Sequence, residues 1–193
     1  MPDKPLRDGA DVSWIRWCKP GDNQGHSLAC GVFAIANWVE VMLEDEIADD
    51  TCIAAWRDER RRVYGNLGGG LWIPEAFEAC QRARIVPAGY EIAQARDLTA
   101  MYRAPLIATY RTTVGWNHTN AAGCIEHNGE SDDKDHAVLA VAWGGIGAAP
   151  VEQRIVWIEN SWGAGRGYHG YFVMLEQFHF AHCSGLWEIR RAA

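Results

Sequence analysis

The hydrophobic pattern of this chain changes character near its middle, and that change limits the folds it can adopt. From Cys30 to about residue 85, apolar residues recur at helical spacing, first on a stripe that runs from Val32 to Leu43. The pattern predicts one helix that begins at or just before Cys30 and a second at about 47–64. A third helix is expected to open at Pro74, because proline is favoured in a first helical turn.

After about Pro105 the sequence changes to short runs rich in β-branched and apolar residues, separated by turn-forming segments. Helices in one half and strands in the other predict an α+β protein with two lobes and a cleft between them. We expect a single domain over residues 1–193, with a helical lobe at about 12–100 and a β-rich lobe at about 101–193. The expected strands are 106–110, 137–143, 155–158, 171–174 and 186–189.

Charge and composition narrow the classes of partner. The formal net charge of −7 offers no field that would attract a polyanion, so nucleic acid is not an expected partner. The cluster Arg60, Arg61 and Arg62 follows acidic residues at helical spacing, and we interpret it as a solvated helix face without a function. No apolar span reaches the roughly 18 residues that a membrane helix needs, so no membrane association is expected.

The N-terminal residues and the cysteines bear on the cellular compartment. No basic segment followed by an apolar one is visible at the N-terminus, which favours the cytoplasm, although export without a leader would leave the same sequence. The six cysteines are scattered and include no Cys-x-x-Cys pair, so a small-domain disulfide framework is not expected. The oligomeric state stays open at this point.

Cys30 is the first candidate for chemistry, because it stands at the start of the apolar-striped helix. The unpaired N–H groups of a helix N-terminus favour a thiolate and are expected to lower the pKa of the cysteine. Gln24 lies on a loop six residues upstream, so its amide and the Cys30 N–H are expected to bind a developing oxyanion. Taken alone, Cys30 also fits a buried structural thiol.

Two later segments add a possible acid/base partner. His136 opens the apolar run 137–141, where an edge facing a cleft would present a proton carrier to a thiol of the other lobe. Asn160 ends another β-rich run and can fix the imidazole, while Trp162 can keep water from that hydrogen bond. A lone histidine there also fits a hydrogen-bonded structural role, but the order Cys, His, Asn at three element ends favours catalysis.

On these segments the chain resembles the papain family of cysteine peptidases, from about Val12 almost to its end. The Asn160 segment, with its following glycines, is the most specific of the matches. The matching segments are Asn23-Gln24-Gly25 with Cys30, Asp135-His136-Ala137-Val138, Asn160-Ser161-Trp162-Gly163, Gly65-Asn66-Leu67-Gly68-Gly69 and Cys183-Ser184-Gly185-Leu186.

The resemblance implies a papain-like fold with the active site in the cleft, and hydrolysis of peptide or protein amide bonds through a thioester, without a cofactor. It implies catalytic roles for Cys30, His136, Asn160 and Gln24. It also implies a substrate-binding role for a second set of residues, in which the glycine stretch meets the substrate backbone. That set is Gly68, Gly69, Leu28, Asp135 and Trp162.

The chain departs from the family pattern at several positions. Gly31 stands where a large aromatic residue is usual, and Ser27 and Asn66 stand where family members form a disulfide. Leu28 replaces a glycine beside the pocket for the residue before the scissile bond, so we expect narrow specificity for glycine or alanine there. Cys124 and Cys183 lie near positions of another family disulfide, and both the bridge and two free thiols stay open.

Other functions were weighed against hydrolysis. An amide-forming acyltransferase or cyclase would use the same residues, and a catalytically silent peptide-binding module would keep only the cleft.

No metal is expected, because two candidate sets of ligands lack a recognised zinc spacing: His118, Cys124 and His127, and His179, His182 and Cys183. The tryptophans in apolar patterns are interpreted as core rather than as carbohydrate platforms. These are Trp14, Trp38, Trp72, Trp157 and Trp187.

Overall fold

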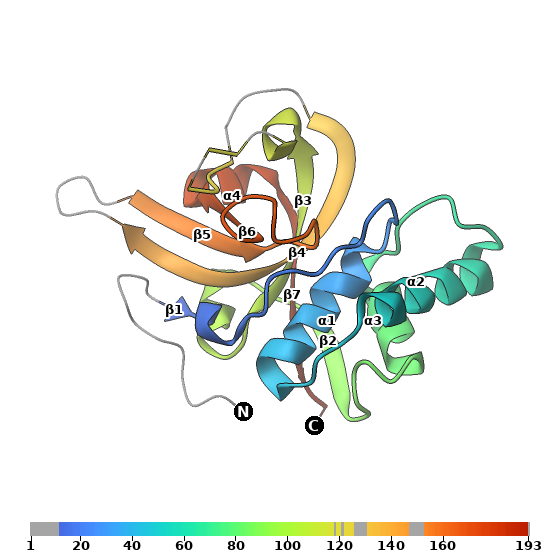
Figure 1. Ribbon diagram of the computed structural model, residues 1–193. Helices are drawn as coiled ribbons and strands as arrows, with labels where there is room; N and C mark the ends of the chain where they lie inside the picture. The colour runs from blue at the N-terminus through green and yellow to red at the C-terminus, as the bar shows by residue number, and fades with distance from the viewer. Residues whose placement is uncertain (1–11, 118, 121, 126–130, 147–152, 193) are drawn as a thin grey trace.

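The computed structural model describes residues 12–117, 119–120, 122–125, 131–146 and 153–192. Three helices, α1 (Cys30–Leu43), α2 (Asp49–Tyr64) and α3 (Ile73–Arg82), gather on one side of the molecule, and an antiparallel sheet occupies the other (Figure 1). The expected α+β fold, with N-terminal helices and a C-terminal antiparallel sheet, is confirmed.

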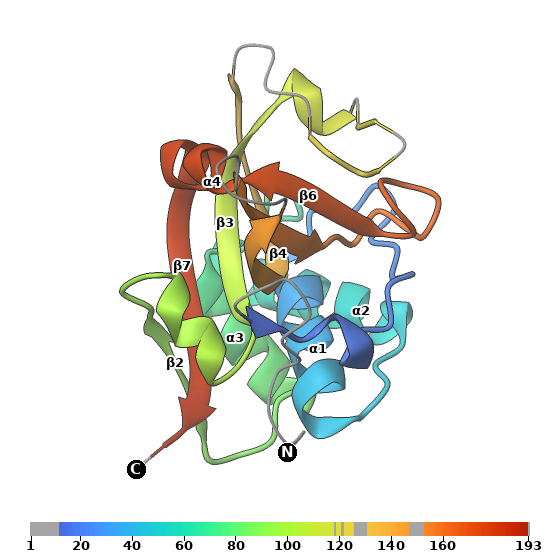
Figure 2. The same ribbon diagram turned by 90° about the vertical axis from the view of Figure 1, so that its left-hand side faces the viewer.

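The sheet has seven strands in the order β2-β7-β3-β4-β5-β6, with β1 paired to β4. Figure 2 shows β7 beside β3, with β2 near its lower end. A short helix, α4 (Glu176–His182), leads directly into β7. The strands are β1 (Val12–Ser13), β2 (Tyr90–Gln94), β3 (Leu106–Thr113), β4 (Ser131–Ile146), β5 (Gln153–Glu159), β6 (Tyr171–Leu175) and β7 (Cys183–Arg191).

The first half of the chain contributes two strands that its pattern does not predict. β1 pairs with the C-terminal part of β4, where Val12 lies opposite Trp143, and β2 pairs with the C-terminal part of β7. Both are short, and β2 is only partly buried, so neither carries a strong alternation of apolar and polar residues. These two pairings therefore connect the first half of the chain to the second, one before the helices (β1 with β4) and one after them (β2 with β7).

The central helix α1 begins where the apolar stripe predicts it, and it is buried almost all round. Every residue from Gly31 to Met42 is buried, as expected of a core helix. Ala29 precedes the helix and provides no side-chain cap, so no capping side chain accepts the N–H groups at the start of α1, and the Val32 N–H donates to the Ala29 carbonyl instead.

Gly31 allows α3 to approach α1 closely. A β-carbon on Gly31 would lie 3.2 Å from Cβ of Ala76 and 3.4 Å from Cδ1 of Ile73. The space that a large aromatic side chain would fill directly after Cys30 is therefore occupied by α3.

The buried face of α2 corrects the interpretation of the arginine cluster. Its buried residues repeat at helical spacing, and the last two are Glu59 and Arg60. Arg60 is only 6% exposed and belongs to the interior, whereas Arg61 and Arg62 are exposed. Helical spacing of charges does not distinguish a buried arginine from an exposed one. Which face of α2 is buried depends on where α3 and the loop that follows α2 pack against it.

Candidate active site

A cleft of about 870 Å³ opens between the start of α1, the chain that leads into α3, and the strands β3, β4 and β7. Both halves of the chain contribute to its walls, as the two-lobed expectation requires. Its lining residues are Gln24, Leu28, Cys30, Gly70, Leu71, Trp72, Ile73, Thr109, Thr112, Thr113, Trp116, Asp135, His136, Ala137, Trp162, Ser184, Gly185 and Trp187.

Cys30 is the first residue of α1 and is half-buried in this cleft. Burial raises the pKa of its thiol above the ordinary value, and the negative charge of Asp135 adds to the rise. Backbone N–H groups of Ala137, Gly31 and Cys30 itself act in the opposite direction. The expected lowering by the helix N-terminus is therefore outweighed, because desolvation penalises the charged thiolate more than these N–H groups favour it.

His136 and Asn160 form a buried hydrogen-bonded pair. His136 lies on β4 and Asn160 directly follows β5, and these neighbouring strands bring Nε2 of the imidazole within 2.8 Å of Oδ1 of the amide. Trp162 stacks on the imidazole with ring centroids 4.8 Å apart and an interplanar angle of 26°. The pair is thus fixed in orientation and covered by an indole, as the sequence predicts.

Trp116 is a further member of the site that the sequence analysis does not single out. It is almost fully buried on the short 3-10 helix Val114–Asn117, and its edge meets the His136 ring at 5.7 Å and 89°. Two tryptophans therefore contact the ring of His136, Trp162 by stacking and Trp116 at a right angle to it. Trp116 lies in an irregular segment without periodicity, so only the tertiary structure reveals its place.

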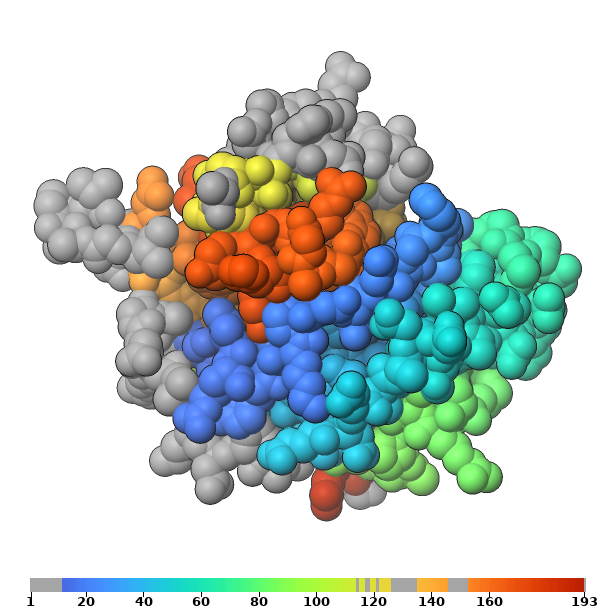
Figure 3. Space-filling view, viewed as in Figure 1, coloured from blue at the N-terminus to red at the C-terminus, as the bar shows by residue number. Residues whose placement is uncertain are grey.

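Gln24 is buried beside the cleft, and its amide orientation is defined. Its Oε1 accepts a hydrogen bond of 2.6 Å from Oγ of Ser161, and its backbone N–H donates to the Ser161 carbonyl at 2.9 Å. Nε2 donates one hydrogen to the Ser27 carbonyl at 3.0 Å and carries a second hydrogen. In Figure 3 the blue segment before α1 lies directly against the orange segment after β5, which is the contact that these bonds make.

The residues expected to bind substrate are only partly brought together. Leu28, Asp135 and Trp162 line the cleft, and Leu28 is 48% exposed. Gly68 and Gly69 are not among the lining residues, and the chain reaches the cleft one position later, at Gly70. The carbonyl groups of Gly68 and Gly69 accept hydrogen bonds from α2 instead.

Trp72 corrects the interpretation of the tryptophans as core. It is 64% exposed and lines the cleft, where its ring meets that of Trp187 edge-on at 5.7 Å. Trp14 and Trp38 are buried as expected, whereas Trp187 is only partly buried. The apolar pattern around Trp72 arises because its neighbours enter the core, while its own side chain points to the cleft.

The cysteines form no disulfide, and Cys124 and Cys183 are free thiols. Among the described residues, no group of three or more His, Cys, Asp or Glu side chains is arranged to hold a metal ion. His118 and His127, two of the residues considered above as metal ligands, lie outside the described residues. No helix in the described part of the chain combines the length and apolar character needed to cross a membrane.

The fold and the groups that meet in the cleft define a papain-like α+β protein. Residues 79–186, which are more than half of the chain, match the family model for papain family cysteine proteases. The protein therefore belongs to the papain family. The matched range includes His136 and Asn160, whereas Cys30 and Gln24 lie before it.

Solved structures share the fold at low sequence identity. A cysteine protease of Carica candamarcensis aligns with a TM-score of 0.67 and 17% identity, over 97% of this chain and 100% of its own. A structure from a study of the mite allergens Blo t 1 and Der p 1 gives a TM-score of 0.66 and 17% identity, over 98% and 73% of the two chains. Bromelain from Ananas comosus gives 0.61 and 17%, over 88% and 90%. No curated protein sequence matches the chain significantly.

Proposed function

We propose that this protein hydrolyses peptide bonds with Cys30 as nucleophile and His136 as acid/base partner. The observation that carries the proposal is the His136–Asn160 pair, which is held at 2.8 Å beside Trp162 and whose histidine lines the same cleft as Cys30. A buried imidazole with a fixed orientation, beside a thiol at a helix start, is suited to nucleophilic catalysis.

Because the pKa of Cys30 is raised, the thiol needs a partner that removes its proton, and His136 is suited to this role. A thiol in this environment stays protonated near neutral pH unless a cation stands beside it, so we infer that His136 takes the thiol proton and stabilises the thiolate as an imidazolium. Nε2 is engaged with Asn160, and Nδ1 is then the nitrogen that exchanges the proton.

The reaction then proceeds in two balanced halves. The thiolate attacks the amide carbonyl, and the resulting oxyanion is bound by the Cys30 N–H and the second hydrogen of Gln24 Nε2. His136 donates its proton to the leaving amine as the C–N bond breaks, which leaves a thioester. His136 next removes a proton from water, water attacks the thioester, and the proton returns to the sulfur as the acid product leaves.

We further propose that specificity is narrow, because Leu28 projects into the cleft beside the nucleophile. Its branched side chain would overlap a bulky substrate residue before the scissile bond, at a cost of about 1–3 kcal/mol, or roughly ten- to hundredfold in turnover. Cleavage after glycine or alanine is the expected preference, and Leu28→Gly should broaden it. If the unaltered protein cuts best after arginine or lysine and Leu28→Gly changes nothing, the steric argument fails.

The function is tested with a diverse peptide library analysed by mass spectrometry, for the unaltered protein and for Cys30→Ala. Hydrolysis that Cys30→Ala abolishes, while circular dichroism shows an intact fold, supports the proposal. Products that instead incorporate an added amine would identify an acyltransferase. Turnover that survives in Cys30→Ala would refute the assignment, and Cys124→Ala is the matched control because that thiol is also half-buried but lies outside the cleft.

A further inference from the structure

We infer that Arg60 is a positioning residue for the cleft wall that meets the substrate backbone, an assignment that rests on the proposed function. Arg60 lies on the inner face of α2 and does not itself line the cleft. Its guanidinium contacts the loop 65–72, whose last residues do line the cleft. This loop lacks the disulfide that the resemblance places between positions 27 and 66, because Ser27 and Asn66 stand there.

Three hydrogen bonds from one guanidinium connect α2 to this loop. Nη1 donates to the carbonyl oxygen of Gly70 at 3.2 Å, and Nη2 donates to the carbonyl oxygen of Gly68 at 3.0 Å and to Oδ1 of Asn66 at 2.9 Å. The guanidinium also lies over the ring of Tyr64, with Cζ 4.0 Å from its centroid. Charge-assisted bonds to three loop acceptors, with the cation shielded from water, hold a loop more firmly than neutral bonds do.

The absence of a side chain at Gly69 leaves room for the guanidinium of Arg60. A β-carbon on Gly69 would lie 3.4 Å from Nη2 of Arg60, and Gly69 has a φ of +141°, which favours glycine. The carbonyl oxygen of Gly69 also points to α2, where it accepts a bond of 3.2 Å from Nε1 of Trp56. Three successive carbonyl groups are thus turned toward α2.

This orientation decides which backbone groups remain for a substrate. In a trans peptide the N–H points away from the carbonyl oxygen, so the N–H groups of Gly70 and Leu71 are directed away from α2. Within the described part of the chain, neither N–H donates to another backbone or side-chain group. They are therefore suited to pair with an extended peptide at the wall that Gly70 and Leu71 line.

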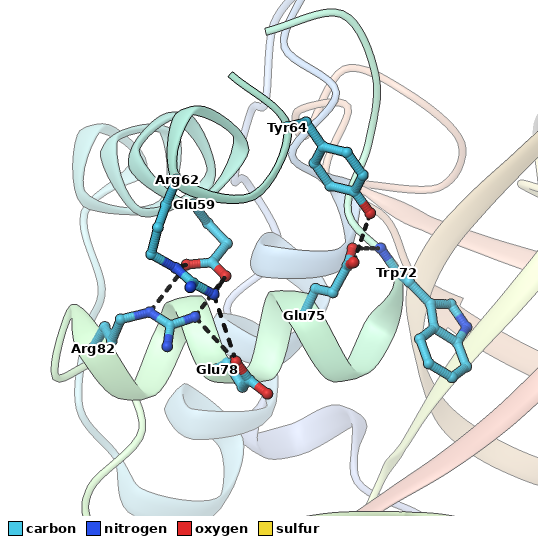
Figure 4. A network of polar contacts seen from close by, with 7 residues as sticks. All are labelled: Glu59, Arg62, Tyr64, Trp72, Glu75, Glu78 and Arg82. Carbon is cyan, nitrogen blue, oxygen red and sulfur yellow. Dashed lines mark hydrogen bonds and ion pairs between the residues drawn. The ribbon is translucent and has the colours of Figure 1, made fainter. Parts of the chain in front are cut away.

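The far end of the loop is fixed by a second set of bonds, which Figure 4 shows. Glu75 of α3 accepts a bond of 2.5 Å from the Tyr64 hydroxyl and one of 3.0 Å from the Trp72 N–H. Gly70 also packs against the segment before α1: a β-carbon on Gly70 would lie 3.4 Å from the carbonyl oxygen of Leu28. With both ends fixed in this way, the middle of the loop is oriented by Arg60, with one further bond from Trp56 to Gly69 and one from the Gly68 N–H to Asn66.

The test compares Arg60→Met, Asn66→Ala and the unaltered protein, with Arg61→Met as the matched control from the exposed face of α2. Arg60→Met should raise KM for a peptide found in the library by about tenfold or more, with a smaller change in kcat, because a displaced wall weakens substrate positioning. Alkylation of Cys30 by iodoacetamide, which does not use the loop, should change by less than about twofold. Arg61→Met should change neither quantity.

Amide hydrogen exchange provides a second readout that does not depend on turnover. The amides of Gly68 and Gly69 donate to Oδ1 of Asn66 and to the Leu67 carbonyl, so they report on the order of the loop. In Arg60→Met these two amides should exchange at least about ten times faster, while those of α1 stay protected. Asn66→Ala removes one of the three bonds together with the bonds of this side chain to the Gly68 N–H and the Tyr64 carbonyl, so it shows the effect of a loosened loop that keeps Arg60. Arg60→Lys keeps the charge but cannot serve three acceptors with a planar fork, so it should give a smaller effect than Arg60→Met in the same direction; it decides the question if Arg60→Met does not fold.

Unchanged exchange at Gly68 and Gly69 together with an unchanged KM would overturn the role of Arg60. Exchange that rises equally in α1 and in the loop would also overturn it, because Arg60 would then support the whole lobe. If the unaltered protein cleaves no peptide, the proposed function fails, and exchange in the loop alone decides whether Arg60 positions it.

Discussion

Glu159 makes the stability of this protein depend on pH in an unusual direction. It ends β5, is only 2% exposed, and directly precedes Asn160. Burial, and then the negative charges of Asp22 and Glu40, raise the pKa of its carboxyl from 4.5 to about 8, although a hydrogen bond with Cys18 acts in the opposite direction. The folded protein therefore binds a proton at Glu159 over a pH range in which the unfolded chain has lost it.

The sign and size of the effect follow from this difference. Because the folded pKa is the higher one, stability from this group is fully present below pH 4.5 and is lost as pH rises toward 8. At pH 7 the chain is about 2.5 units above the unfolded pKa, and each unit corresponds to about 1.4 kcal/mol, so the loss relative to strongly acidic pH is about 3 kcal/mol. Between pH 5 and pH 7 it is about 2 kcal/mol.

Replacing Glu159 with glutamine keeps the shape of the side chain and removes its ionisation. We expect Glu159→Gln to gain stability over the unaltered protein as pH rises, by about 2 kcal/mol between pH 5 and pH 7, in urea unfolding followed by tryptophan fluorescence. The comparison must be between variants, because burial and its acidic neighbours also raise the pKa of Asp22, to about 7, with the same sign. Glu44→Gln, at an exposed site, is the control. A constant difference between Glu159→Gln and the unaltered protein at both pH values would refute the reasoning.

Three further predictions concern the site and its support. His136→Ala should move the alkylation of Cys30 by iodoacetamide to above about pH 9, because burial then acts on the thiol without an imidazolium; an unchanged profile would separate the two residues. Asn160→Ala should lower kcat less than Cys30→Ala does, since it removes orientation rather than chemistry, and equal losses in single-turnover assays would contradict this. Gly167→Ala would place a β-carbon 2.2 Å from a backbone oxygen of β6, so it should lower the unfolding free energy by about 2–5 kcal/mol, whereas Gly165→Ala, in open space, should not.

Much of this protein is determined by local sequence. The helical stripe from residue 32 to 43 predicts α1 and its first residue, Cys30, because a helix buried on almost every side needs a nearly continuous apolar surface. The runs that start near His136 and end near Asn160 predict β4 and β5, since a strand passing through a core has few other compositions available. The order of these three residues and their places at element ends are likewise visible without a structure.

Other features depend on contacts between distant segments, and no local pattern contains them. Arg60 is indistinguishable in sequence from its exposed neighbours, and its burial is set by the packing of α3 and the glycine loop on α2. Trp116 reaches His136 only because β3 and β4 pair, and the strands β1 and β2 exist only because β4 and β7 offer them partners. The pKa of Cys30 is the sharpest case. The sequence places the thiol at a helix N-terminus, which favours its charge, but the surrounding fold excludes water, and the resulting loss of solvation outweighs the helix.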